Sequence, residues 1–96
     1  REEIHYDIIW CKKMLERTKR NDVEGAYRYH WLLVDSLQIF FSIINQYYFG
    51  PKKSLNFLQE EYPTAYELYS NALTTPLSYE TLEPWITYME DYFTNQ

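Results

Sequence analysis

The chain has 96 residues, 46% of them hydrophobic and 20% aromatic, which is enough apolar material for one small core. This composition excludes an intrinsically disordered chain, and a single cysteine excludes an internal disulfide framework or a cysteine-based zinc cluster. The net charge of −5 makes duplex nucleic acid and anionic membranes poor partners, because both are polyanions. We expect a single helical domain over residues 1–96, located in the cytoplasm, that binds neither duplex nucleic acid nor membranes.

The first segment predicts an amphipathic helix of roughly 18–20 residues. Its apolar stripe recurs at spacings of three and four residues and consists of Ile4, Ile8, Cys11 and Leu15. Cys11 lies on this stripe, so we expect it to be a buried core thiol and not a reactive group. Asn21 and Asp22 then favour a helix break and a new N-cap.

The second segment predicts a long central helix over about residues 22–48. One of its two apolar stripes contains Val23, Ala26, His30, Leu33, Leu37, Phe40, Ile44 and Tyr47. The neighbouring stripe contains Tyr27, Trp31, Val34, Gln38, Phe41, Asn45 and Tyr48. Two adjacent stripes indicate a helix buried over a wide arc, with His30 as a hydrogen-bonded core residue. Gly50 and Pro51 are typical of a helix end.

The rest of the chain predicts shorter helices separated by proline-containing breaks. Ser54 is a candidate cap for a helix that ends at Tyr62–Pro63, and the next helix stops at Thr74–Pro76. The last helix starts at Ser78, or near Thr81 or Glu83 because Pro84 follows. The fold class is therefore all-α, an antiparallel bundle of four to five helices around the central one.

Two features of the central helix are candidates for function. The first is a polar line on one side of the helix, formed by Arg28, Asp35, Gln38, Ser42 and Asn45. It is either the water-facing stripe of the bundle or a surface that orients a ligand or another domain. The second is the segment from Asn45 to Lys53, which joins aromatic residues to the only two basic residues after position 30. It suits a nucleotide or another anion, or else it is a helix end with solubilising charges.

These residues also carry a resemblance to a known family. The pattern Tyr27-Arg28-x-His30, followed by Asn45-x-x-Tyr48-Phe49 and Lys52, is similar to the helical C-terminal domain of bacterial nucleotidyltransferases of the polymerase-β superfamily. That domain belongs to the substrate-binding, or HEPN-like, bundles, and the similar stretch covers about residues 22–73. Ribonucleases of the HEPN group carry Arg and His with four to six residues between them, a spacing that this chain lacks.

The resemblance implies an accessory domain of an enzyme that transfers a nucleotide monophosphate to a small-molecule acceptor, for example an antibiotic-like compound. It implies a nucleotidyltransferase domain, in cis or on a separate chain, that holds Mg²⁺ and the nucleoside triphosphate, while this chain has no cofactor, metal or catalytic residue of its own. The family's Gly-Ser and Asp-x-Asp are absent from these residues, and the chain begins with Arg1, so we expect a fragment of a longer protein.

The expected substrate-binding residues lie along and after the central helix: Asn45, Tyr48, Lys52, Lys53, Tyr27, Arg28, Trp31, Asp35 and Gln38. The aromatic residues would line an acceptor pocket, Lys52 would meet phosphate, and Asp35 would hold a cationic acceptor. The alternative is a non-catalytic helical interaction module, because Tyr and Trp are enriched at interfaces. Such a module would form a homodimer or pair with a nucleotidyltransferase on another chain.

Overall fold

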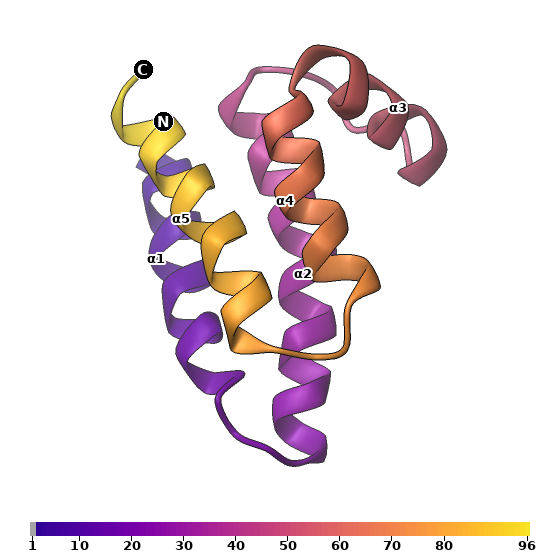
Figure 1. Cartoon of the computed structure of the whole chain (residues 1–96). Helices are drawn as coiled ribbons and strands as arrows, with labels where there is room; N and C mark the ends of the chain where they lie inside the picture. The colour runs from indigo at the N-terminus through magenta and orange to yellow at the C-terminus, as the bar shows by residue number, and fades with distance from the viewer. Residues whose placement is uncertain (1) are drawn as a thin grey trace.

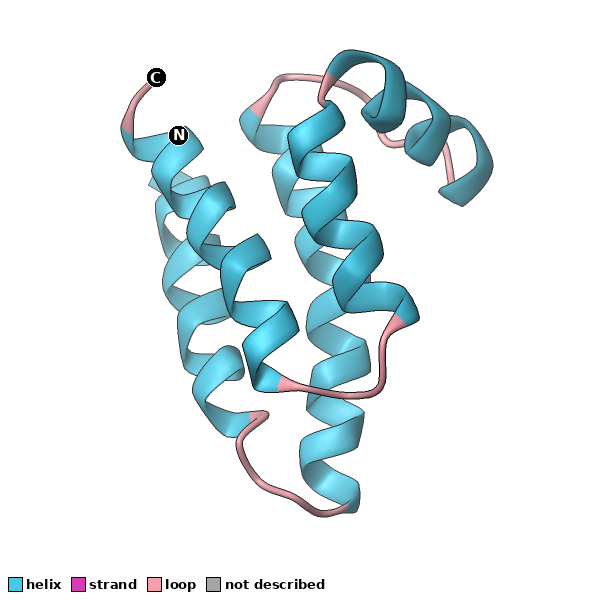
Figure 2. Cartoon of the chain, viewed as in Figure 1, coloured by secondary structure: helices cyan, strands magenta, loops and turns pink. Residues whose placement is uncertain are grey.

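The computed structural model describes residues 2–96, and this part of the chain consists of five α-helices without a β-strand (Figures 1 and 2). The helices are α1 (Glu2–Arg17), α2 (Val23–Ile43), α3 (Pro51–Glu61), α4 (Pro63–Thr74) and α5 (Tyr79–Thr94). The predicted all-α bundle is therefore confirmed. No helix among residues 2–96 combines the length and the hydropathy needed to cross a bilayer.

The helices α1, α2, α4 and α5 form the bundle, and α3 lies across one end of it. α1 packs on α2 and α5, while α4 packs on α5, α2 and α3. Successive bundle helices run in opposite directions, and α3 projects sideways beyond the end of α2 (Figure 1). α2 is the longest helix and contacts three others, so it is the central helix that the sequence predicts.

The tight turn before α2 follows the predicted N-cap. The Oδ1 atom of Asp22 accepts a hydrogen bond from the backbone N–H of Gly25 at 2.9 Å, and its Oδ2 accepts one from the Arg20 guanidinium at 2.8 Å. A Cβ atom at position 25 would collide with the backbone carbonyl oxygen of Arg20, so this turn requires glycine. The turn sets how closely α1 and α2 approach.

The C-terminal bound of the central helix, predicted near residue 48, is wrong. α2 ends at Ile43, because Asn45 adopts a left-handed backbone conformation with φ of 58°. The N–H of Asn45 donates to the carbonyl of Ser42, and the N–H of Gln46 donates to that of Phe41. This pair of bonds is a Schellman motif with asparagine in the position usually taken by glycine. The apolar pattern continues to Tyr48, but those residues form an extended connection.

The predicted core stripe of α2 is also displaced. Val23, His30 and Tyr47 are exposed, although the sequence places them in the core. The observed buried stripe instead includes Tyr29 and Ser36, whose hydroxyl groups form hydrogen bonds inside the bundle. The prediction failed here because a hydrophobicity pattern ranks polar side chains as surface residues.

The start of α3 differs from the sequence-based expectation, whereas α5 follows Ser78, the first of its two expected starts. α3 begins at Pro51, so Ser54 is not its cap; the buried Ser54 hydroxyl accepts a hydrogen bond from the N–H of Phe49 at 2.9 Å. α5 begins at Tyr79 directly after its cap Ser78, and Pro84 lies inside the helix. A later start at Thr81 or Glu83 is therefore wrong.

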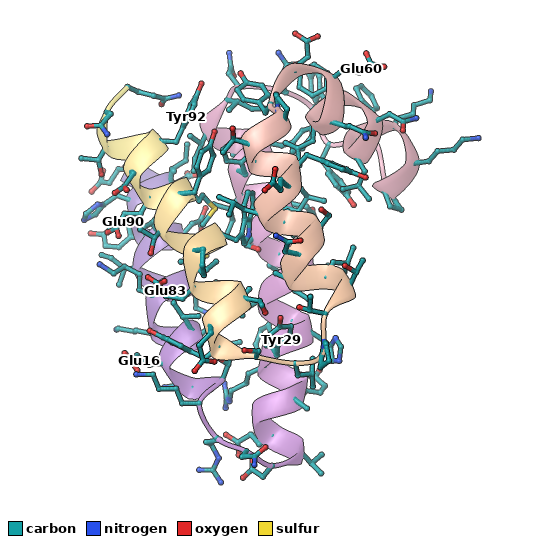
Figure 3. All side chains as sticks on the ribbon, in the orientation of Figure 1. Glu16, Tyr29, Glu60, Glu83, Glu90 and Tyr92 are labelled. Carbon is teal, nitrogen blue, oxygen red and sulfur yellow. The ribbon has the colours of Figure 1, made fainter. Side chains whose placement is uncertain are left out.

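The core is organised around the fully buried indole of Trp85. Its Nε1 donates to the Ser36 hydroxyl at 2.9 Å, and that hydroxyl donates to the carbonyl of Leu33 at 3.2 Å. The same carbonyl accepts the Tyr69 hydroxyl at 2.8 Å, and the Tyr69 ring packs on the indole. These bonds tie α2, α4 and α5 together. A second tyrosine, Tyr29, reaches from α2 toward the α4–α5 connection (Figure 3) and donates to the carbonyl of Ala72.

We predict that Ser36→Ala lowers the free energy of unfolding by about 1–3 kcal/mol, because the buried indole N–H then has no acceptor. Urea denaturation measures this change. Ser42→Ala is the matched control: its hydroxyl bonds to a carbonyl on the exposed side of the same helix, so we expect a change within about 0.5 kcal/mol. Equal effects of the two substitutions would contradict the proposed importance of the Ser36–Trp85 bond.

Candidate functional site

A shallow groove of about 470 Å³ runs along the outer side of the α1–α2 pair. Its walls carry two carboxylates, two indole rings, one amide and one aliphatic side chain, contributed by Asp7, Trp10, Trp31, Asp35, Gln38 and Ile39. The first two residues come from α1 and the others from α2. The antiparallel packing of the two helices therefore builds the groove, and we call it the α1–α2 groove.

Aromatic contacts fix the shape of the α1–α2 groove. The rings of Trp10 and Trp31 meet edge to face, with centroids 5.5 Å apart. The Nε1 of Trp31 donates to the Oδ2 of Asp35 at 3.0 Å, a bond that the one-turn spacing of the two residues permits. Tyr27 lies against the other side of Trp31 and is 69% exposed. One indole therefore orients a carboxylate and separates Tyr27 from the groove.

The electrostatics of the α1–α2 groove are unbalanced. Neither Asp7 nor Asp35 has an ion-pair partner among the described residues. Partial burial, with the nearby charge of Glu3, raises the pKa of Asp7 above its ordinary value. Beneath the groove, burial raises the pKa of the Cys11 thiol to about 12, and the charges of Asp7 and Asp35 add to that effect. Two carboxylates beside two indole faces favour a bound cation.

The predicted site residues on α2 divide between two environments. Trp31, Asp35 and Gln38 line the α1–α2 groove. Arg28 does not: its guanidinium donates to Glu24 at 3.0 Å and contacts the sulfur of Met14 at 3.6 Å. Sequence reasoning missed Asp7 and Trp10. Their spacing of three residues on a helix was the available signal, but nothing in the sequence places α1 beside that part of α2.

The remaining predicted residues lie at the far end of α2. Asn45 ends the helix, and Tyr48 packs edge to face on Phe41 with centroids 5.8 Å apart. Lys52 and Lys53 are exposed in the first turn of α3. The last residue of α2 is about 18 Å beyond Trp31 along the helix axis. The expected aromatic and basic residues therefore form two separate surfaces and not a single pocket.

No protein-family model, curated protein sequence or solved structure matches this chain. The relation to nucleotidyltransferase helical domains stays a prediction from the sequence motif. Residues 2–96 also contain no group of three or more His, Cys, Asp or Glu side chains placed to hold a metal ion. The function of the α1–α2 groove must therefore be inferred from the chemistry of its own residues.

We predict that Cys11 of the native chain resists thiol reagents at pH 8. A pKa of about 12 leaves roughly one thiolate in ten thousand at that pH, and the side chain is fully buried. A colorimetric disulfide-exchange assay measures the rate, with the chain in concentrated urea as the fully reactive control. Because the folded thiol holds its proton more tightly than the unfolded one, the free energy of unfolding should fall as pH rises above about 8.5. Rapid stoichiometric labelling of the native chain would contradict this burial.

Proposed function

We propose that the chain is a substrate-binding helical domain that holds a cationic small molecule in the α1–α2 groove. The observation that carries the proposal is the pair of carboxylates, Asp7 and Asp35, which have no cationic partner among the described residues and stand beside two indole rings. A ligand ammonium group supplies the missing positive charge. The groove is open along one side, which suits an elongated amine.

Each wall of the α1–α2 groove has a distinct task in this proposal. Asp35 is held by the Trp31 N–H, so its free oxygen accepts a hydrogen bond from the ligand without losing much side-chain entropy. The indole faces attract the same cation, an interaction worth about 0.5–2 kcal/mol. Gln38 adds an amide at the edge, which can donate to or accept from a ligand hydroxyl.

We propose further that this binding serves nucleotidyl transfer by a separate domain, in cis or on another chain. The support is the sequence motif from Tyr27 to Lys52, together with the amine-binding chemistry of the α1–α2 groove. In this arrangement the other domain supplies Mg²⁺, the nucleoside triphosphate and catalysis. This chain binds the acceptor, and we assign to Lys52 the contact with phosphate.

The test of ligand binding uses spermidine as the probe and the intrinsic fluorescence of Trp10 and Trp31 as the signal. We predict that Asp35→Asn weakens spermidine binding about tenfold or more, because a charge-assisted hydrogen bond contributes about 1.5–3 kcal/mol. Asp91→Asn is the matched control, since Asp91 is an exposed carboxylate on α5. Sorbitol, an uncharged polyol, should not bind. Equal spermidine affinity of both variants would remove the groove as a cation site.

The test of the nucleotidyltransferase relation uses the full gene product with Mg²⁺, labelled nucleoside triphosphates and polyamine acceptors. We predict that Lys52→Ala lowers kcat/KM for transfer by about tenfold while the free energy of unfolding stays the same. Asn45→Gly is the suitable substitution at the helix end, because alanine would strain the left-handed backbone there. Unchanged kinetics in the folded Lys52→Ala, Asn45→Gly double variant would exclude both residues from the reaction.

A second candidate function is a helical interaction module. The observation that favours it is an exposed apolar stripe on α2, where Tyr27 is 69% and Val34 is 58% exposed, on either side of Trp31. Such a stripe marks an interface when it is continuous. Sedimentation equilibrium separates the two functions: concentration-dependent mass without spermidine binding favours the interaction module, and a monomer that binds spermidine favours the substrate-binding domain.

A further inference from the structure

A second concave surface lies at the opposite end of α2 from its N-cap, where the connection to α3 crosses over (Figure 1). It is an apolar hollow of about 220 Å³, and its lining is supplied by Phe41, Gln46, Tyr47, Phe49, Lys53, Ser54 and Phe57. We call it the α3 hollow. Its residues come from the end of α2, the connection and α3, so it does not share a side chain with the α1–α2 groove.

The α3 hollow has aromatic side chains both at its base and at its rim. Phe41 and Phe57 meet at the base, with ring centroids 5.9 Å apart. Tyr47 and Phe49 form the rim, with centroids 5.8 Å apart, and they are 82% and 68% exposed. Large rings left this open beside a depression are typical anchors of protein–protein contacts. The volume suits one large side chain rather than the whole face of a helix.

The charge beside the α3 hollow is positive. Lys52 and Lys53 are exposed, and neither forms an ion pair with any described residue. α3 also begins without a side-chain cap, and the two lysines lie in its first turn, at the positive end of the helix. The other charged side chains in residues 31–96 are eight carboxylates. The two lysines are therefore a local positive charge in a negative part of the chain.

We propose that the α3 hollow is a docking surface for an acidic protein segment that inserts one large apolar side chain over Phe41 and Phe57, below the rim formed by Tyr47 and Phe49. Carboxylates of the segment pair with Lys52 and Lys53, and the rim rings cover the inserted side chain. Charge complementarity selects this partner, because two unpaired ammonium groups flank an otherwise apolar depression. The proposal is independent of the α1–α2 groove, and spermidine binding does not bear on it. It assigns Lys52 to a carboxylate where the nucleotidyl-transfer proposal assigns it to a phosphate, so the comparison with Mg²⁺–ATP below decides between the two.

The chemistry of the α3 hollow favours a peptide over a nucleoside triphosphate. A triphosphate concentrates several negative charges at one point, and here only two lysines stand against the repulsion of a chain with net charge −5. Besides Lys53, the lining offers a phosphate only the hydroxyl groups of Tyr47 and Ser54 and the amide of Gln46, and Ser54 is buried. An acidic peptide spreads single charges along its length, so each lysine meets one carboxylate.

The experiment titrates a peptide of Glu, Asp and Gly with one central Phe into ¹⁵N-labelled protein and follows the amide resonances. We expect shifts concentrated between residues 46 and 57, and an affinity that falls as salt is added. Replacing the central Phe of the peptide by Ala, or its acidic residues by Lys, should each weaken binding at least tenfold.

Variants of the chain identify the groups that carry the interaction. Lys53→Gln and Phe49→Ser should each weaken peptide binding at least fivefold, while Lys13→Gln, at an exposed lysine of α1, should not. Shifts that are absent, or equal affinity in all three variants, would overturn the proposal. A Mg²⁺–ATP complex that shifts the same amides and binds more tightly than the peptide would assign the hollow to a nucleotide instead.

Discussion

The hydrogen bond from Trp85 to Ser36 is the interaction on which the bundle depends. A buried indole N–H needs an acceptor, and the Ser36 hydroxyl supplies it, which brings this polar position of α2 opposite α5. The same turn of α2 gives its Leu33 carbonyl to Tyr69 of α4. One short stretch of α2 thus fixes the rotation of three helices about their axes. The rotation of α2 then decides which of its side chains face outward.

That rotation is what produces the α1–α2 groove. With Tyr29 and Ser36 turned inward, Trp31 and Asp35 fall on the opposite side of α2, next to α1. The turn built from Arg20, Asp22 and Gly25 holds α1 close enough for Trp10 to meet Trp31. The carboxylates lie at the edge of a packed interface, where burial and nearby negative charges raise the pKa of Asp7 and that of the Cys11 thiol. The orientation of α2 about its axis therefore determines both the core and the α1–α2 groove.

The sequence predicts the helices better than it predicts their ends and faces. Capping residues mark some boundaries well, so the helices after Asp22 and Ser78 begin where the pattern indicates, while α3 begins at Pro51 and not after Ser54. The end of α2 could not be predicted from the sequence, because an apolar pattern does not reveal that Asn45 adopts a left-handed backbone conformation.

The candidate site was predictable in part. Trp31, Asp35 and Gln38 share a helix face, which spacing alone establishes. Asp7 and Trp10 join them only through tertiary packing, and no local pattern encodes that. Lys52 is separated from Trp31 because the chain between them is helical as far as Ile43, which alone places the end of α2 about 18 Å from Trp31.

The position of α3 has a consequence for how such a chain can change. α3 contributes only Ser54 and Leu58 to the buried set and lies outside the four-helix bundle, between the end of α2 and the start of α4 (Figure 2). Insertions or replacements there leave the Trp85 network and the α1–α2 groove in place. The four-helix bundle therefore keeps its geometry while α3 is exchanged, and the bundle and α3 can acquire different specificities independently of each other.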